Sequence, residues 1–397
     1  MQLRTVAAGL TLALPLVTGA CVESDRLVTP VTIPENAIFQ RYVAMGNSIT
    51  AGVQSAGIND STQRRSYAAL ITGASNFPYY YASLQGRGCA PPFVNNVTQE
   101  RVGGGGPATC DLRAPDHHPW LSNVAVPTAR VIDAVDNNLT TSNSNALTTL
   151  ILGGRTQVQA MQDAEPTLVT VWLGSNDFGG ALFNTSIPGD ISRLTPVPDF
   201  ETAYGQVLDA IEATGAPAVL ITLPLPRVIP FNSSGATYWC LSTGLCPGVP
   251  ASFPANFLVD VSCAPSTAVP TSEGQNVLVP WAIGVVRLLT AAQDPLNDYT
   301  LDCTVDADVI LPAELAAIEA AATGYNAYIT AQAAARGMTL VDVNPAFLAA
   351  AAANDGRILP FPDVSAVAGG GSITFGTWFS LDGIHPSSLA QGVHSFL

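Results

Sequence analysis

Apolar runs and amphipathic segments alternate along most of the chain. Residues 167–173 form an uninterrupted apolar run, which is typical of a strand covered on both faces, and residues 41–45 predict another buried strand. In residues 201–214 the apolar side chains fall on one face of a helix, which Gly215 ends. Further strands are predicted at residues 122–126, 218–223 and 339–343, and further helices at residues 66–73, 128–135 and 314–336.

This alternation of strand and helix predicts an α/β fold, with a parallel sheet of about five strands and helices on both of its faces. Two segments interrupt the pattern. Residues 79–120 are rich in Gly, Pro and Cys and predict a long loop. Residues 231–311 are dense in Pro, Ser, Gly and Cys, so we expect an insertion outside the sheet. Its apolar stretch, residues 277–289, contains Pro280 and Arg287 and therefore does not predict a membrane span.

The amino terminus has the pattern of an export signal. Arg4 supplies the positive charge, and residues 6–17 form an apolar core that is too short to span a membrane. We predict a signal peptide at residues 1–20, followed by a polar tether at residues 21–38 and a folded domain at residues 39–397. Cys21 stands directly after small residues, as in bacterial lipoprotein signals. It is therefore the predicted site of lipidation, with plain secretion as the alternative.

Composition excludes several classes of function. The formal net charge is −15, and every one of the fifteen basic residues is arginine. Without lysine, a Schiff-base mechanism or a Walker-type phosphate loop is excluded. The acidic balance argues against a nucleic-acid partner, because phosphates require a basic surface.

Six cysteines remain when Cys21 is set aside, and an even set in an exported protein suggests three disulfides. Six cysteines allow 15 connectivities. Pairing each cysteine with its nearest neighbour in the sequence is one guess among these connectivities. We expect no zinc site, because no CxxC pair or histidine cluster accompanies the cysteines. Pairing by nearness gives Cys89–Cys110, Cys240–Cys246 and Cys263–Cys303.

Three short fragments carry candidate chemistry. Ser48 follows the first predicted strand, Asn176 follows the third, and Asp382 stands three residues before His385. Acyl transfer needs a nucleophile, a base and donors for the oxyanion, and Ser48, His385 and Asp382 are the residue types of such a triad. The candidate oxyanion donors are the backbone N–H of Ser48, a backbone N–H near Thr128 and the Asn176 amide.

The base must be one of four histidines. His117 and His118 are adjacent in a proline-bounded loop, which predicts a surface position. His394 has no acidic residue shortly before it, whereas His385 follows Asp382. We therefore expect His385 to be the base and Asp382 to orient it. Taken singly, a serine after a strand is usually a turn or a helix cap, Asn-Asp after a strand is ordinarily turn chemistry, and a lone Asp-x-x-His could be a surface pair.

Together these fragments resemble the blocks of the GDSL-type hydrolases, also called the SGNH family, and they occur in the family's order. Residues 46–50 resemble the nucleophile block, residues 174–177 match Gly-x-Asn-Asp, and residues 382–385 match Asp-x-x-His. Residues 123–129 resemble the second block, with Thr128 where the family has glycine. The resemblance implies a flavodoxin-like three-layer α/β/α sandwich that needs no metal and no cofactor.

The sequence therefore predicts a lipase or esterase that cleaves carboxylic esters of lipids or acylated sugars through an acyl-enzyme on Ser48. We expect an outer-membrane or cell-surface lipoprotein, held at the membrane if Cys21 is modified, or otherwise a periplasmic or secreted protein. No Gly-x-Ser-x-Gly pentapeptide supports an ordinary α/β-hydrolase.

Two other functions and two roles of the insertion remain open. The chain could be a non-catalytic surface lipoprotein on a degenerate hydrolase scaffold, binding glycans or a partner, or it could be a polysaccharide acetylesterase. The insertion at residues 231–311 could pack its own core, or it could form an acyl-binding wall over the active site.

Overall fold

The computed structural model describes residues 37–75, 77–111, 113–115, 118–138, 146–249 and 251–394. The chain divides into two units, Met1–Ala37 and Ile38–Leu397, and the second holds the sheet and its helices. The predicted signal peptide, the lipidation site Cys21, nearly all of the tether and His117 lie outside the described residues.

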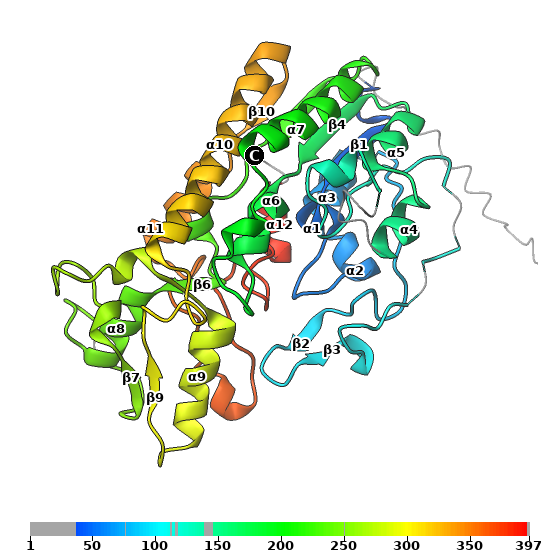
Figure 1. Ribbon diagram of the computed structural model, residues 1–397. Helices are drawn as coiled ribbons and strands as arrows, with labels where there is room; N and C mark the ends of the chain where they lie inside the picture. Colours follow the sequence, from blue (N-terminus) through cyan, green and yellow to red (C-terminus); the bar gives the residue numbers. More distant parts are fainter. Residues whose placement is uncertain are drawn as a thin grey trace, which may run out of the picture. The chain divides into compact units, whose positions relative to one another are not determined.

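A parallel sheet forms the centre of the second unit (Figure 1). The segment at residues 122–126 runs beside the free edge of β1 (Tyr42–Gly46), where Ala44 N–H donates to Ser122 O (2.7 Å) and Val124 N–H donates to Ala44 O (3.0 Å). The pairing amounts to one isolated parallel bridge, Ala44 with Asn123, so this expected strand is an extended segment. The strands run in the order β1 (Tyr42–Gly46), β4 (Leu168–Trp172), β5 (Ala218–Ile221) and β10 (Thr339–Val341).

With the extended segment counted second, the spatial order is 2-1-3-4-5, which is the order of flavodoxin-like sheets. Helices lie on both sides of the sheet, which confirms the predicted α/β sandwich (Figure 1). Helices α5 (Gln157–Asp163), α7 (Val197–Glu212) and α10 (Pro312–Arg336) pack in one group, and α3 (Tyr67–Ser75) packs with α12 (Ser388–His394).

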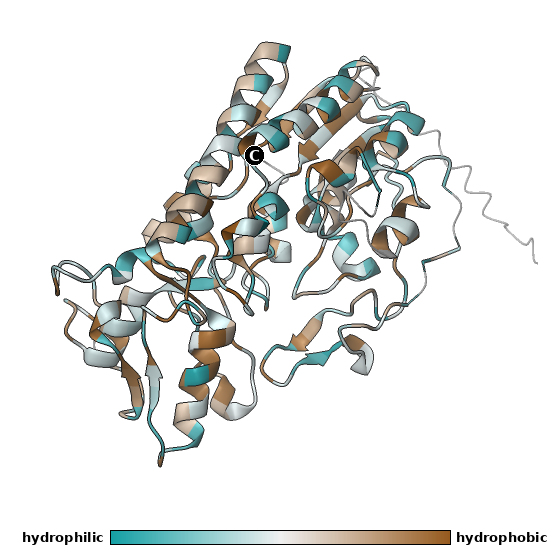
Figure 2. Cartoon of the chain, in the orientation of Figure 1, coloured by the Kyte–Doolittle hydropathy of each residue, from teal (hydrophilic) through white to brown (hydrophobic). Residues whose placement is uncertain are grey.

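The core follows the apolar pattern of the sequence. Strands β1 and β4 are buried at every position. In Figure 2 the arrow of β4 is largely brown, whereas α7 also shows teal, hydrophilic positions. Helix α7 begins four residues before the predicted start, because Pro198 is tolerated within the first turn of a helix. Its buried face consists of Phe200, Ala203, Tyr204, Val207, Leu208 and Ile211.

The helix predicted at residues 128–135 does not form. The structure has only the 3₁₀ turn η3 (Ile132–Ala134) there. Thr128 adopts a left-handed conformation with φ of 68°, which interrupts a right-handed helix at its first residue. The other α-helices described outside the insertion are α1 (Ser48–Ala51), α2 (Asp60–Gln63), α4 (Ala146–Leu152), α6 (Ser175–Leu182) and α11 (Asn344–Ala353).

The predicted long loop contains a short antiparallel hairpin, β2 (Phe93–Asn95) and β3 (Glu100–Arg101). A disulfide between Cys89 and Cys110 closes the segment that holds this hairpin. Within the part of the chain that the structure describes, no helix is long and apolar enough to cross a membrane.

The insertion at residues 231–311 builds a small subdomain with its own apolar packing. Disulfides Cys240–Cys246 and Cys263–Cys303 lie within it, so the six cysteines form the same three pairs that nearness suggests. Within the insertion, Phe257 packs against Phe253 with 5.4 Å between ring centroids and against Tyr238 with 6.5 Å. The helices and strands of the insertion are β6 (Asn232–Ser234), α8 (Gly235–Thr243), β7 (Phe257–Val259), β8 (Leu278–Pro280), α9 (Trp281–Gln293) and β9 (Tyr299–Leu301).

Candidate active site

The register of β1 and β4 brings two of the sequence fragments to one edge of the sheet. Gly46 pairs with Trp172, so the residues that follow both strands emerge side by side. Ser48 begins α1, and Asn176 lies in the first turn of α6. This edge lies between the first and third strands of the flavodoxin-like order, where the chain changes direction and open α/β sheets bind ligands.

Local hydrogen bonds fix the segment that carries Ser48. Gln157 binds both polar groups of Gly46, accepting from its N–H (3.0 Å) and donating to its carbonyl (2.9 Å). The buried Asn47 side chain caps α1 by accepting from the Ile49 N–H at 3.3 Å. Gln391 of α12 donates to the Ile49 carbonyl at 3.1 Å. Ser48 is half-buried, and its backbone N–H has no partner among the described residues.

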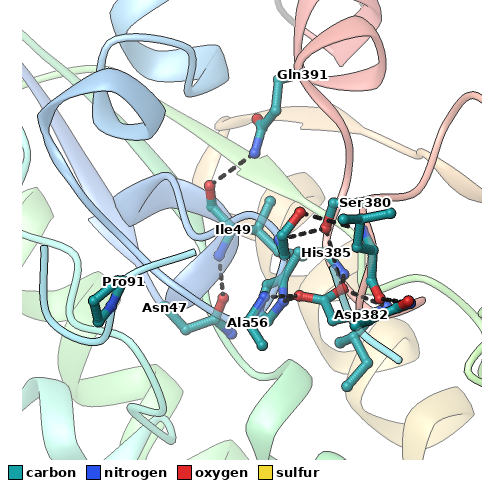
Figure 3. A network of polar contacts seen from close by, with 12 residues as sticks. Asn47, Ile49, Ala56, Pro91, Ser380, Asp382, His385 and Gln391 are labelled. Carbon is teal, nitrogen blue, oxygen red and sulfur yellow. Dashed lines mark hydrogen bonds and ion pairs between the residues drawn. The ribbon is translucent and has the colours of Figure 1, made fainter. Parts of the chain in front are cut away.

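The loop at the far end of the chain holds the other two triad candidates (Figure 3). Asp382 is 5% exposed, and its Oδ2 lies 2.7 Å from Nδ1 of His385. Its Oδ1 accepts from the backbone N–H groups of Ile384 and His385, both at 2.9 Å, and from the Ser380 hydroxyl at 3.1 Å. The Ala56 N–H donates to Oδ2 at 2.5 Å. The carboxylate is therefore surrounded by donors that stabilise its charge.

These donors determine the charge state of Asp382. Burial alone raises the pKa of a carboxyl group. At Asp382, the interaction with the His385 imidazole and the backbone N–H bonds of His385 and Ile384 outweigh burial and lower the pKa to about 2. An ionised Asp382 keeps the proton of a neutral imidazole on Nδ1, so that Nε2 can act as a base.

The loop after residue 126 lies against the start of α6. Thr128 has a φ of 68°, a left-handed conformation that is rare for a β-branched residue. Asn176 Nδ2 donates to the Ala129 carbonyl at 2.9 Å, and Asp177 Oδ2 accepts the Val131 N–H at 3.0 Å. Two consecutive residues of α6 thus hold the segment that contains Thr128.

Asp177 is fully buried behind this loop. Burial raises its pKa to about 7, although the Thr195 side chain, the Val131 N–H and the nearby charge of Arg130 act in the opposite direction. Its second oxygen, Oδ1, has no hydrogen-bond partner within the described part of the chain.

Gly174, just before α6, has a φ of 130°, and a Cβ there would lie 2.8 Å from the Phe200 ring. This turn therefore requires glycine.

One cavity of about 320 Å³ brings the candidates together. Ser48, Thr128, Asn176 and His385 all line it. Ser48 and His385 form no direct hydrogen bond in the described structure, and catalytic bonds of this kind often shorten only in a substrate complex. Most of the remaining lining is apolar and includes Ile49, Val53, Ile58, Leu147, Phe183, Ile229, Phe347, Phe379 and Ile384.

The walls of the cavity bear on the role of the insertion. Among the described residues, none from 231–311 lines the cavity, so the insertion does not form the acyl-binding wall considered above. The insertion instead packs against the main domain, with Trp281 5.7 Å from Phe375 and Phe231 5.5 Å from Phe183 between ring centroids. Inside the insertion, Phe253 and Phe257 lie 5.4 Å apart between ring centroids, which supports the expected packing of its own core.

The other histidines lie elsewhere or outside the description. His118 stacks on Tyr80 with 5.0 Å between ring centroids and does not line the cavity. His394 belongs to α12. In residues 37–75, 77–111, 113–115, 118–138, 146–249 and 251–394, no group of three or more His, Cys, Asp or Glu side chains could hold a metal ion.

Sequence reasoning missed several residues that support the site. Gln157, Ala56 and Ser380 contact the nucleophile segment or the Asp382 carboxylate, and none of them belongs to a recognisable motif. Ser380 has one available signal, because it stands two residues before Asp382 in the same loop. Ala56 acts through its backbone, so its side chain carries no signal.

The chain matches no protein-family model and no curated protein sequence. Solved structures to which it is similar include an extracellular lipase from Streptomyces rimosus (16% identity, 88% of this chain and 94% of that chain, TM-score 0.37). A phospholipase A1 from Streptomyces albidoflavus is also similar (16% identity, 90% and 95%, TM-score 0.38). A variant of an acetyl-xylooligosaccharide esterase from Geobacillus Stearmophilus is a third (10% identity, 90% and 91%, TM-score 0.37).

Proposed function

We propose that this protein is a serine hydrolase that cleaves carboxylic esters through an acyl-enzyme on Ser48. The single observation that carries the proposal is the arrangement around His385. Its Nδ1 lies 2.7 Å from the buried Asp382 carboxylate, while its ring lines the same cavity as Ser48. A base oriented by a carboxylate beside a serine is the arrangement that activates a hydroxyl nucleophile.

In the proposed reaction, His385 Nε2 takes the proton of Ser48 Oγ as that oxygen attacks the ester carbonyl carbon. The tetrahedral oxyanion accepts hydrogen bonds from the Ser48 N–H, the second N–H of the Asn176 amide and the Thr128 N–H. Asp382 stabilises the imidazolium. The imidazolium then gives its proton to the departing alcohol, which leaves an acyl ester on Ser48. Water, activated by the same His385, hydrolyses that ester and restores the enzyme.

The apolar lining of the cavity favours esters with an apolar acyl chain over acetate. Phe183, Phe347 and Phe379 offer aromatic surface to such a chain, and each methylene that leaves water contributes about 0.8 kcal/mol. A panel of p-nitrophenyl esters from acetate to palmitate tests this preference. We expect kcat/KM to rise from acetate to esters with longer chains, and a maximum at acetate would favour an acetylesterase.

We also propose that the protein acts outside the cytoplasm. Three disulfides are typical of oxidising compartments. The lipid anchor at Cys21 rests on the sequence pattern alone. Mass spectrometry of the mature amino terminus tests it, because a diacylglyceryl group on Cys21 adds a defined mass.

Ser48→Ala tests the proposed nucleophile, and the chain offers a matched control. Ser372 stands in a second Ser-Ile-Thr sequence, and its hydroxyl donates to the Val94 carbonyl away from the cavity. We expect Ser48→Ala to abolish turnover of a short p-nitrophenyl ester and Ser372→Ala to retain it, with both variants folded by circular dichroism. Full activity in Ser48→Ala would remove Ser48 from the mechanism, and an inactive wild-type protein would favour a binding function.

A further inference from the structure

A short turn joins the nucleophile segment to the loop of Asp382. In this turn, residues 54–57, the backbones of Gln54 and Gly57 exchange two hydrogen bonds, and both central residues are left-handed, Ser55 with φ of 54° and Ala56 with φ of 51°. Neither is Gly, Asn or Asp, the residues that usually occupy such turns. Backbone of this kind persists only where the surrounding structure holds it in place.

The turn contacts the catalytic loop through hydrogen bonds that span most of the chain. The Ala56 N–H donates to Asp382 Oδ2, and the Ser55 N–H donates to the Ser380 hydroxyl at 2.8 Å. The Leu381 N–H donates to Ser55 Oγ at 3.3 Å. The conformation of Ala56 thus determines whether Asp382 keeps one of its donors.

Arg101, at the end of β3, binds the other side of the same peptide segment. Its Nη1 donates to the Ala56 carbonyl at 2.9 Å and to the Pro91 carbonyl at 2.6 Å. The side chain is 8% exposed, and its guanidinium lies 3.9 Å from the centroid of the Phe93 ring. No carboxylate within the described residues forms an ion pair with it. A buried charge needs such partners, so we conclude that the two carbonyls and the ring hold the guanidinium.

The hairpin that carries Arg101 is itself fixed against two segments, the turn at residues 54–57 and the loop of Asp382. Gly57 lies so close to the hairpin's start that an added Cβ would be 2.3 Å from the Pro92 nitrogen. On the other side, the buried Asn96 donates to the Leu381 carbonyl at 2.7 Å and to the Ile373 carbonyl at 2.9 Å. The disulfide-closed segment, residues 89–110, therefore contacts both the turn and the loop of Asp382 and holds them in place.

We propose that Arg101 is a positioning residue of the reaction. By holding the Ala56 carbonyl it fixes the Ala56 N–H, which in turn holds the carboxylate that orients His385; Figure 3 shows Ala56, Asp382 and His385 in this arrangement. This inference rests on the proposed function, because it assigns Arg101 a role in the same site. It gives the disulfide-closed segment a part in catalysis, although none of its side chains supplies a reacting group.

The test compares Arg101→Met with a matched arginine control just outside that segment. Arg87 lies two residues before Cys89, just outside the segment that the Cys89–Cys110 disulfide closes. It pairs at the surface with Asp111 and contacts neither Ala56 nor Asp382. The active sites of wild type, Arg101→Met and Arg87→Met are titrated with a fluorophosphonate. Their kcat per titrated site and their kcat/KM over pH are then measured with one p-nitrophenyl ester.

We expect Arg101→Met to lower kcat per titrated site by roughly tenfold, because a small displacement of a catalytic group is enough for such a loss. The acidic limb of its kcat/KM profile should move to higher pH, since a carboxylate with one donor fewer stabilises the imidazolium more strongly. Arg87→Met should match wild type in both. A merely structural Arg101 would lower the melting temperature and the labelled fraction but leave kcat per site and the profile unchanged.

If Arg101→Met keeps the wild-type kcat per titrated site and the wild-type dependence of kcat/KM on pH, the inference is overturned. The proposed function is then unaffected. An unlabelled, inactive wild-type protein would instead overturn the proposed function. If Arg101→Met does not fold, Arg101→Gln replaces it in the same measurements. A fall in kcat per titrated site then supports the inference, and a wild-type value overturns it.

Discussion

Asp382 binds His385 at two places. Its Oδ2 lies 2.7 Å from the imidazole Nδ1, and its Oδ1 accepts the backbone N–H of the same residue at 2.9 Å. The carboxylate therefore fixes both the ring and the backbone that carries it. Because Asp382 is buried and its pKa is lowered to about 2, it remains ionised across the neutral range.

Asp382→Asn tests this relationship. The amide oxygen can still accept from the Ile384 and His385 N–H groups. The NH2 group that replaces Oδ2 cannot accept from Ala56 and favours the wrong imidazole tautomer, so we expect kcat to fall by about 10⁴. The measurement is turnover of a p-nitrophenyl ester at neutral pH. Asp355→Asn, at an exposed residue paired with Arg357, is the control and should behave as wild type. A loss of less than about tenfold in Asp382→Asn would mean that the carboxylate does not orient the base.

Asn176→Ala tests the oxyanion donor on α6. Removing the Nδ2 donor should lower kcat by about 10²–10³ with little change in KM, because the interaction strengthens only as charge develops on the oxygen. Steady-state kinetics measure both constants. Asn184→Ala is the matched control, since Asn184 follows the same helix but does not line the cavity. An unchanged kcat in Asn176→Ala would exclude this amide as a donor.

Two substitutions at Thr128 separate its backbone from its side chain. Thr128→Gly suits the left-handed φ of 68°, so we expect retained activity and a free energy of unfolding higher by about 1 kcal/mol. Thr128→Pro removes the N–H and fixes φ near −65°, so activity should be lost. Urea unfolding and kcat are measured for both. A folded Thr128→Pro variant with wild-type kcat would contradict the assignment of the Thr128 N–H.

Asp177 should make stability depend on pH. Its pKa is raised from 3.8 to about 7 by burial, so between about pH 4 and pH 7 the folded state holds a proton that the unfolded state has released. The free energy of unfolding should therefore fall as pH rises through this window, by an amount on the order of 4 kcal/mol. Urea unfolding across the window measures this fall.

Asp177→Asn should flatten that dependence. The amide keeps an acceptor for the Val131 N–H but does not titrate, whereas Asp133 and Arg130 nearby are unchanged. Equal slopes in the variant and in wild type would show that another group causes the dependence.

The sequence indicates the strands of the sheet and the candidate catalytic residues because both leave patterns within short stretches of the chain. The run at residues 167–173 predicts β4 almost to its ends, and the fragments around Ser48, Asn176 and Asp382 are contiguous in sequence. The helix expected from residue 128 was wrong because a left-handed threonine has no periodic signature. Short helices such as α4 and α5 span too few turns to show a clear apolar face.

The supporting contacts could not be predicted for a different reason. Asn96 binds a carbonyl 285 positions away, and the donor on Ala56 reaches Asp382 across 326 positions. Hydrophobic periodicity reports only on neighbours along the chain, and backbone donors leave no trace in residue type. The role of the disulfide-closed segment thus becomes visible only once the chain is folded.

The proposed nucleophile is tested most directly by locating, with peptide mass spectrometry, the residue that a fluorophosphonate labels. We predict one phosphonyl adduct per chain, on the peptide that contains Ser48, and none in Ser48→Ala. An adduct on another serine, or a wild-type protein that hydrolyses esters without labelling at Ser48, would contradict it.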